Sequence, residues 1–190
     1  MSTENAGHYQ ESGGSGPDGL LAASGGTRPE VDIAGMAERG LEVPHAEVFR
    51  VPIDCERVRV ETQRPKGGLL LAKVNKRPCA FELIAEFIHC ENRVIEPEET
   101  VDLRQHGLKG FITAHKEIVT IFIGGPEHPY QIERGERTVA QILGEVGKTP
   151  EGYVLLEEKD GPPLPVPPNV PVKISGCEMF YTQPQTGGSS

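Results

Sequence analysis

The chain has 190 residues, with 19 Lys and Arg against 28 Asp and Glu, and a formal net charge of −9. An acidic surface repels phosphate backbones and anionic lipids, which argues against nucleic acid and membranes as partners. No apolar run approaches the length of a transmembrane helix, and the first residues lack the basic and apolar regions of a signal peptide. We therefore expect a cytoplasmic protein.

The N-terminal segment is poor in residues that build a core. From Met1 to Pro29 there is no Val, Ile or Phe, and Gly and Ser dominate. Such a segment buries too little apolar surface to compensate for the entropy lost on ordering. We predict a disordered tail over residues 1–46, in which Val31–Met36 is either a short partner-binding element or part of a tail that only solubilises.

Residues 47–115 form the first predicted unit. It opens with a hairpin rich in β-branched residues, continues with one amphipathic helix and closes with further strands. The expected elements are strands at 48–51 and 57–60, a helix at about 66–75, a strand at 81–88, and short strands at 101–103 and 111–113.

Residues 117–183 form the second predicted unit, in which the helix is best marked. Thr138 is a plausible N-cap, Val139, Ile142, Leu143 and Val146 make one apolar stripe, and Gly147 ends the helix. Six prolines between residues 162 and 171 exclude a central strand there and predict an irregular loop. The expected strands are 118–123, 129–133, 153–156, 172–174 and 179–182.

The two units align without gaps around their helices when the chain is shifted by 72 residues. This register indicates a duplication. Because each unit offers one helix to cover one small mixed sheet, we predict an α+β protein of two tandem β-grasp domains, with one larger intertwined sheet as the alternative. The aligned pairs include Leu70 with Ile142, Leu71 with Leu143, Val74 with Val146, Lys76 with Lys148, and Phe81 with Tyr153.

Two stretches resemble the bacterial multi-ubiquitin domain: the Lys-x-Pro turn after the first helix, and the TVDLR sequence at Thr100–Arg104 that is followed by Gly and Phe. The two-unit layout is similar to that of two-domain ubiquitin-like modifiers, some of which act in antiviral defence. The resemblance implies a ubiquitin-like modifier, with four kinds of partner: an E1-like adenylating enzyme, an E2-like conjugating enzyme, a processing and deconjugating peptidase, and target proteins.

The C-terminal residues 184–190 are predicted to form a flexible arm that carries the motif Thr186, Gly187 and Gly188. Modifiers of this kind are activated through a terminal Gly-Gly, because only glycine lets the backbone pass through a narrow enzyme channel. Gly188 is thus the expected conjugation site, and Ser189 and Ser190 would first be removed by processing. The arm differs from that of ubiquitin in lacking arginine and in carrying Pro184, which stiffens it.

The sequence offers little for catalysis, a metal or a cofactor. The carboxylates of Glu96, Glu98, Glu99 and Asp102 are interpreted as solvated charges, and the adjacent His89 and Cys90 as unrelated side chains. We expect no enzyme activity, no cofactor and no metal site. The cysteines lack metal-ligand spacing and are interpreted as structural thiols that behave as small apolar residues: Cys55, Cys79, Cys90 and Cys177.

Two functions remain open from the sequence. One is a covalent modifier joined to target amines through the Gly188 carboxylate. The other is a non-covalent adaptor whose sheet and helix faces bind partners while the C-terminus stays inert. The two differ in the mature mass, because only the modifier needs to lose Ser189 and Ser190.

Overall fold

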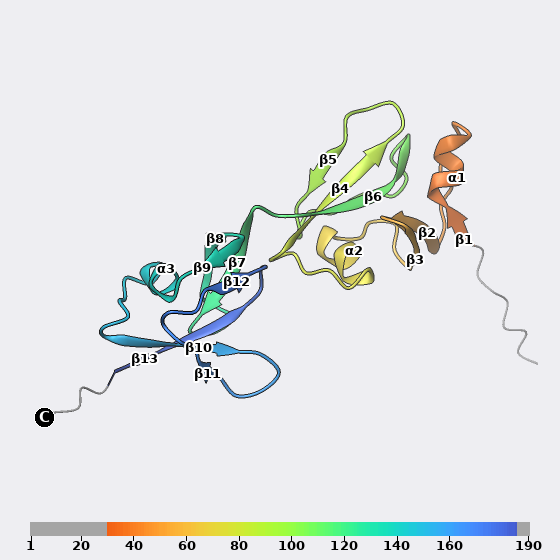
Figure 1. Cartoon of the computed structure of the whole chain (residues 1–190). Coiled ribbons are helices and arrows are strands. Elements are labelled where there is room, and N and C mark those ends of the chain that lie inside the picture. The colour runs from red at the N-terminus through yellow and green to blue at the C-terminus, as the bar shows by residue number, and fades with distance from the viewer. Residues whose placement is uncertain (1–29, 186–190) are drawn as a thin grey trace, which may run out of the picture.

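The computed structural model describes residues 30–185, which contain thirteen strands and three helices (Figure 1). The structure is therefore a mixed α/β arrangement in which strands predominate. Buried side chains form two separate apolar cores, one built from residues between Ile33 and Phe111 and one from residues between Val119 and Phe180. We refer to the described residues up to His115 as the first half and to those from Ile118 as the second half.

The first half is organised around a mixed sheet in which β2 and β6, the strands at its centre, run parallel. Across the sheet the order is β3, β2, β6, β4 and β5, and helix α2 (Gly67–Lys73) contributes Leu70 and Leu71 to the core. The strands are β2 (Val48–Ile53), β3 (Glu56–Val60), β4 (Phe81–Phe87), β5 (Arg93–Ile95) and β6 (Leu108–His115).

The second half repeats this order as β8, β7, β13, β10 and β11, again with the first and last main strands parallel at the centre. Helix α3 (Val139–Gly144) begins with a capping box, in which Thr138 and Gln141 satisfy each other's backbone N–H groups. The strands are β7 (Ile118–Ile123), β8 (Pro129–Glu133), β10 (Tyr153–Glu158), β11 (Leu164–Pro165) and β13 (Met179–Pro184), with β9 (Gly135–Arg137) and β12 (Val172–Ile174) paired separately.

The helix ends are alike in the two halves. Asn75 and Gly147, 72 residues apart, both have left-handed backbones, with φ of 56° and 66°. The next residue donates its backbone N–H back into the helix at the same distance of 3.0 Å, from Lys76 to Leu71 and from Lys148 to Leu143. This is the hydrogen bond that satisfies a carbonyl at a helix C-terminus. The aligned residues therefore build the same turn.

The prediction of a disordered tail up to residue 46 is wrong from Glu30 onward. Strand β1 (Glu30–Asp32) pairs in parallel with β2, and helix α1 (Ile33–Glu38) follows it, in orange in Figure 1. Ile33 is fully buried and Val43 nearly so, and both belong to the first core. The few apolar side chains of this segment complete an existing core, which needs far less apolar surface than forming a new one. Residues 1–29 lie outside the described part of the chain.

Charged side chains fasten β1 to the hairpin beside it. Arg50 pairs with Glu30 at 2.8 Å, and Arg57 with Asp32 at 3.2 Å. Asp32 is also the N-cap of α1, accepting a hydrogen bond from the backbone of Gly35. These contacts are half exposed and individually weak, so burial of Ile33 contributes more to holding the segment in place.

Two smaller boundary predictions also change. Residues 101–103 are a loop rather than a strand, although the side chains of Val101 and Leu103 are buried in the first core. The proline-rich loop carries the two-residue strand β11 at the edge of the second sheet, where proline is tolerated because no further strand needs its missing N–H.

Candidate functional site

The last strand, β13, leads directly to the predicted C-terminal motif. It lies between β7 and β10 and extends to Pro184, which pairs with Tyr153. Gln185 is also held, because its backbone N–H donates to the carbonyl of Gly152 at 2.9 Å and its side-chain amide to that of Pro150 at 2.7 Å. The predicted flexible arm therefore does not begin at residue 184. The motif residues Thr186, Gly187 and Gly188, with Ser189 and Ser190, lie outside the described residues.

A lysine from the turn after α3 secures β13 close to its end. The Lys148 ammonium donates a hydrogen bond to the Thr182 hydroxyl at 2.6 Å and lies 4.6 Å from the centre of the Tyr153 ring. The ring face attracts the cation, and the hydroxyl accepts one of its protons. This contact fixes the strand two residues before it ends, and so fixes where the chain leaves the sheet.

The first half has the same contact with a carboxylate added. Lys76 donates to the Thr113 hydroxyl, lies 5.0 Å from the centre of the Phe81 ring and pairs with Asp54 at 2.8 Å. Asp54 also accepts hydrogen bonds from the backbone and hydroxyl of Thr113, at 2.8 and 2.9 Å. Burial acts to raise the pKa of Asp54, but the hydrogen bonds from Lys76 and Thr113 outweigh it and lower that pKa.

Replacing Lys76 with methionine should raise the pKa of Asp54, because the change removes both a hydrogen bond and a positive charge from a partly buried carboxylate. A group with a lowered pKa contributes stability that is present above its unfolded pKa, about 4 for aspartate, and lost as the pH falls through its folded pKa. Unfolding free energy should therefore depend less on pH below about pH 4 in Lys76→Met than in the wild type.

The measurements are an NMR titration of the Asp54 carboxyl and urea unfolding at several acidic pH values. Lys148→Met is the matched control, because its ammonium binds a threonine hydroxyl rather than a carboxylate. It should leave the Asp54 titration unchanged. An unchanged Asp54 pKa in Lys76→Met would contradict the assignment of that lysine as its partner.

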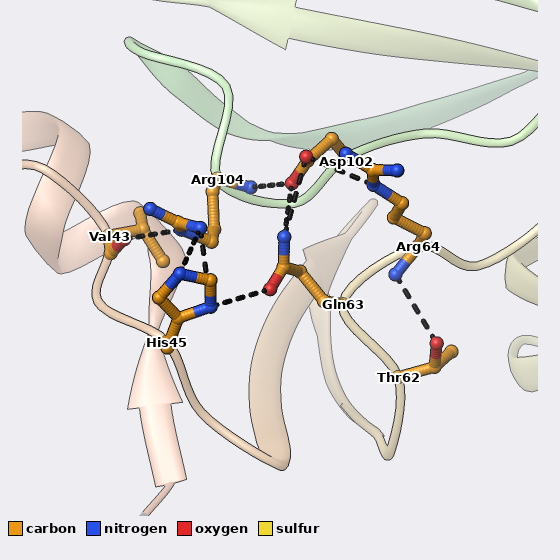
Figure 2. Close-up of polar contacts among 7 residues, drawn as sticks. All are labelled: Val43, His45, Thr62, Gln63, Arg64, Asp102 and Arg104. Carbon is orange, nitrogen blue, oxygen red and sulfur yellow. Dashed lines mark hydrogen bonds and ion pairs between the residues drawn. The ribbon is translucent and has the colours of Figure 1, made fainter.

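A polar cluster explains the TVDLR sequence in structural terms (Figure 2). Asp102 accepts hydrogen bonds from the backbone of Arg104 at 3.0 Å, the Gln63 amide at 3.2 Å and the Arg64 guanidinium at 3.3 Å. The hydrogen bond from the Arg104 backbone is the largest contribution that lowers the pKa of Asp102. Burial acts to raise that pKa, and the hydrogen bonds from Gln63 and Arg64 lower it further. The carboxylate thus ties the loop before β6 to the segment after β3.

The same cluster reaches the N-terminal segment through Arg104. Its guanidinium donates to the carbonyl of Val43 at 3.1 Å and lies 2.8 Å from Nε2 of His45. Gln63 Oε1 lies 3.2 Å from Nδ1 of the same ring. Arg104, in the TVDLR sequence, thus fastens the segment before β2 to the rest of the first half.

Two of the four cysteines are joined in a disulfide, Cys79 with Cys177, while Cys55 and Cys90 are free and exposed. The interpretation of all four as small apolar thiols is therefore wrong. The bonded pair is 98 residues apart in sequence and links the two halves. Nothing in the spacing of the cysteines indicated this partnership, because it depends on how the halves meet. The sequence aligned Lys76 with Lys148 but gave no sign of their ring and hydroxyl contacts.

The other residues considered for chemistry are not gathered into one site. Glu98 pairs with Lys66 and Glu99 with Arg93, as surface ion pairs. Within residues 30–185 there is no group of three His, Cys, Asp or Glu placed to bind a metal. None of the helices described is both long and apolar enough to cross a bilayer.

A groove of about 620 Å³ lies beside the proline-rich loop. Its lining is mainly apolar, with Val166 and the strongly exposed Leu164 and Val170 among prolines. Four charged residues also line it: Glu157, Lys159, Asp160 and Lys173.

No family model, curated protein or solved structure matches the chain.

Proposed function

We propose that the chain is a ubiquitin-like protein modifier built from two tandem β-grasp domains, 47–115 and 117–183, with the segment from Glu30 packed onto the first of them. The observation that supports the fold is the strand order. Each half places its first and last main strands side by side and parallel, with a hairpin partner outside the first and two further strands outside the last. The aligned helices α2 and α3 each supply two or more apolar side chains to the core of their half, and α1 adds Ile33 to the first core.

The function rests on the position of the glycine pair relative to β13. Gly187 and Gly188 follow the end of that strand by three and four residues. The contacts of Thr182 and Gln185 hold the strand end, so the glycines are the first part of the chain that an enzyme could draw into a channel. Gly188 is then the conjugation site. The partners are an E1-like adenylating enzyme, an E2-like conjugating enzyme, a peptidase and cytoplasmic target proteins, in a setting of antiviral defence.

The same arrangement would serve a non-covalent adaptor, and the apolar groove around Leu164 and Val170 is the observation that favours it. The intact mass of the protein isolated from its native host separates the two functions. A modifier is expected to lack Ser189 and Ser190, whereas an adaptor is expected to retain the full C-terminus. A full-length mass for both the free protein and any covalent adducts would refute activation through Gly188.

A further inference from the structure

The two halves are joined at a point where covalent and backbone contacts coincide. Cys79 lies in the turn before β4 of the first half, and Cys177 in the loop before β13 of the second. Their Cα atoms are 5.3 Å apart, and both residues are only partly buried. We therefore expect a small thiol in solution to reach the bond.

Backbone hydrogen bonds around the disulfide join the second half to the first. Strand β13 pairs with β7 only at Phe122 and Ile123. At Thr120, farther back along β7, the partners are the two cysteines. The Thr120 N–H donates to the Cys79 carbonyl at 2.9 Å, and the Cys177 N–H donates to the Thr120 carbonyl at 2.7 Å. A third bond, from the N–H of Lys116 to the carbonyl of Ala80 at 3.0 Å, lies beside them.

The packing at this joint is close. Gly176 has a φ of +106°, and a Cβ placed there would lie 2.7 Å from the Ala80 Cβ and 2.8 Å from the Cys79 carbonyl oxygen. Both the backbone conformation and the space therefore require glycine. The loop that carries Cys177 is thus shaped to the surface of the first half.

We propose that the Cys79–Cys177 disulfide is a reversible redox lock that fixes the orientation of the two halves. Neither cysteine belongs to the apolar core of its half, so opening the bond leaves both cores intact. The connection that remains is Lys116 and Glu117, the two residues between β6 and β7, with the three backbone hydrogen bonds. Without the covalent link, the halves turn relative to each other about these two residues.

The lock opens by thiol–disulfide exchange with a dithiol reductant. One thiolate of the reductant attacks a sulfur of the disulfide, forms a mixed disulfide and releases the other cysteine as a thiolate. The second thiolate of the reductant then attacks the reductant's first sulfur, which is bonded to the protein in the mixed disulfide, and releases the second cysteine as a thiolate. Two electrons and two protons pass to the protein, and the reductant becomes a cyclic disulfide. A disulfide oxidant reverses both steps. In a reducing compartment, such a bond is expected to act as a sensor rather than a permanent staple.

The test uses the full chain carrying Cys55→Ser and Cys90→Ser, which removes the free exposed thiols and keeps the pair. Alkylation of the oxidised, denatured protein should modify no cysteine, and alkylation after dithiothreitol should modify two. Residual dipolar couplings of backbone amides are then measured in both states. One alignment tensor should fit both halves when the bond is closed. Two different tensors should be needed after reduction, with amide chemical shifts of both cores unchanged.

Three outcomes would overturn the proposal. The first is reactive thiols in protein prepared with a disulfide oxidant, which would mean that the bond does not form. The second is one common alignment tensor in both redox states, which would mean that the backbone contacts alone fix the orientation. The third is loss of amide dispersion in the second half on reduction, which would make the bond a requirement for folding. Addition of Cys79→Ser and Cys177→Ser to the same chain should reproduce the reduced tensors without dithiothreitol.

Discussion

Gly188→Ala should abolish covalent conjugates of this protein in its native host. In the proposed mechanism the Gly188 carboxylate is adenylated, transferred to a cysteine thiol and attacked by a lysine amine, and a methyl group beside the carbonyl crowds each of these steps. The same methyl group hinders removal of Ser189 and Ser190. The measurement is the pattern of higher-mass species on denaturing gels, for protein expressed with the enzymes of the host.

The controls for this experiment come from the end of β13. Deletion of residues 187–190 should also abolish conjugates, while truncation directly after Gly188 should retain them by making processing unnecessary. Neither change should affect folding, because both lie beyond β13 and leave the contacts of Gln185 with Gly152 and Pro150 in place. Samples are boiled with reductant, since the exposed Cys55 and Cys90 would otherwise form disulfide-linked species.

Conjugates that are equally abundant in wild type and Gly188→Ala would place the attachment at another group. If the wild type forms none and the deletion variant keeps its activity in the host, the protein acts as an adaptor instead. Either result leaves the redox lock untouched, because that proposal concerns only the joint at Cys79 and Cys177.

The secondary structure could be predicted well where a repeated local pattern exists. The helix stripe around Leu143, the Thr138 cap and the left-handed ends at Asn75 and Gly147 are all properties of short windows, and each signal occurs in or near the described helices. The strand at 101–103 was predicted because it aligns with residues 172–174, yet there the apolar alternation of Val101 and Leu103 reflects burial of a loop. Alternation shows which side chains face a core and does not by itself show that a strand pairs.

The segment from Glu30 to residue 46 escaped prediction for a different reason. The segment is too polar to fold alone, and the prediction assumed that it would have to fold without the rest of the first half. Ile33 and Val43 instead fill places in a core that the rest of the first half has already built, and Arg104 holds the backbone of Val43 from 61 residues away. The same limit applies to the disulfide, whose partners are brought together only by the contact between halves. Long-range contacts of this kind leave no periodic trace in the sequence.

Leu71→Ala and Leu143→Ala should each lower the unfolding free energy by about 2–5 kcal/mol, the range for emptying a buried leucine site. Leu71 is 1% exposed and Leu143 0% exposed, and they lie on α2 and α3, the helices that contact β4 and β10. A half of this size has a small core, so the loss corresponds to a fall in melting temperature on the order of 10 °C. Urea unfolding and thermal melts measure the two effects.

The control is Leu69→Ala, which makes the same change in the same helix as Leu71→Ala, but at a side chain that is 45% exposed. It should cost only a few tenths of a kcal/mol, as surface substitutions usually do.

Because the two cores share no residues, hydrogen exchange should show the largest loss of protection in the half that carries the substitution. The disulfide and the hydrogen bonds at Thr120 transmit part of the loss. The other half should therefore lose some protection, though less than the substituted half, and it should lose more in oxidised than in reduced protein. If Leu69→Ala and Leu71→Ala cost the same, α2 would not pack as described. If each substitution weakened both halves equally in either redox state, the two cores would instead unfold as one cooperative unit.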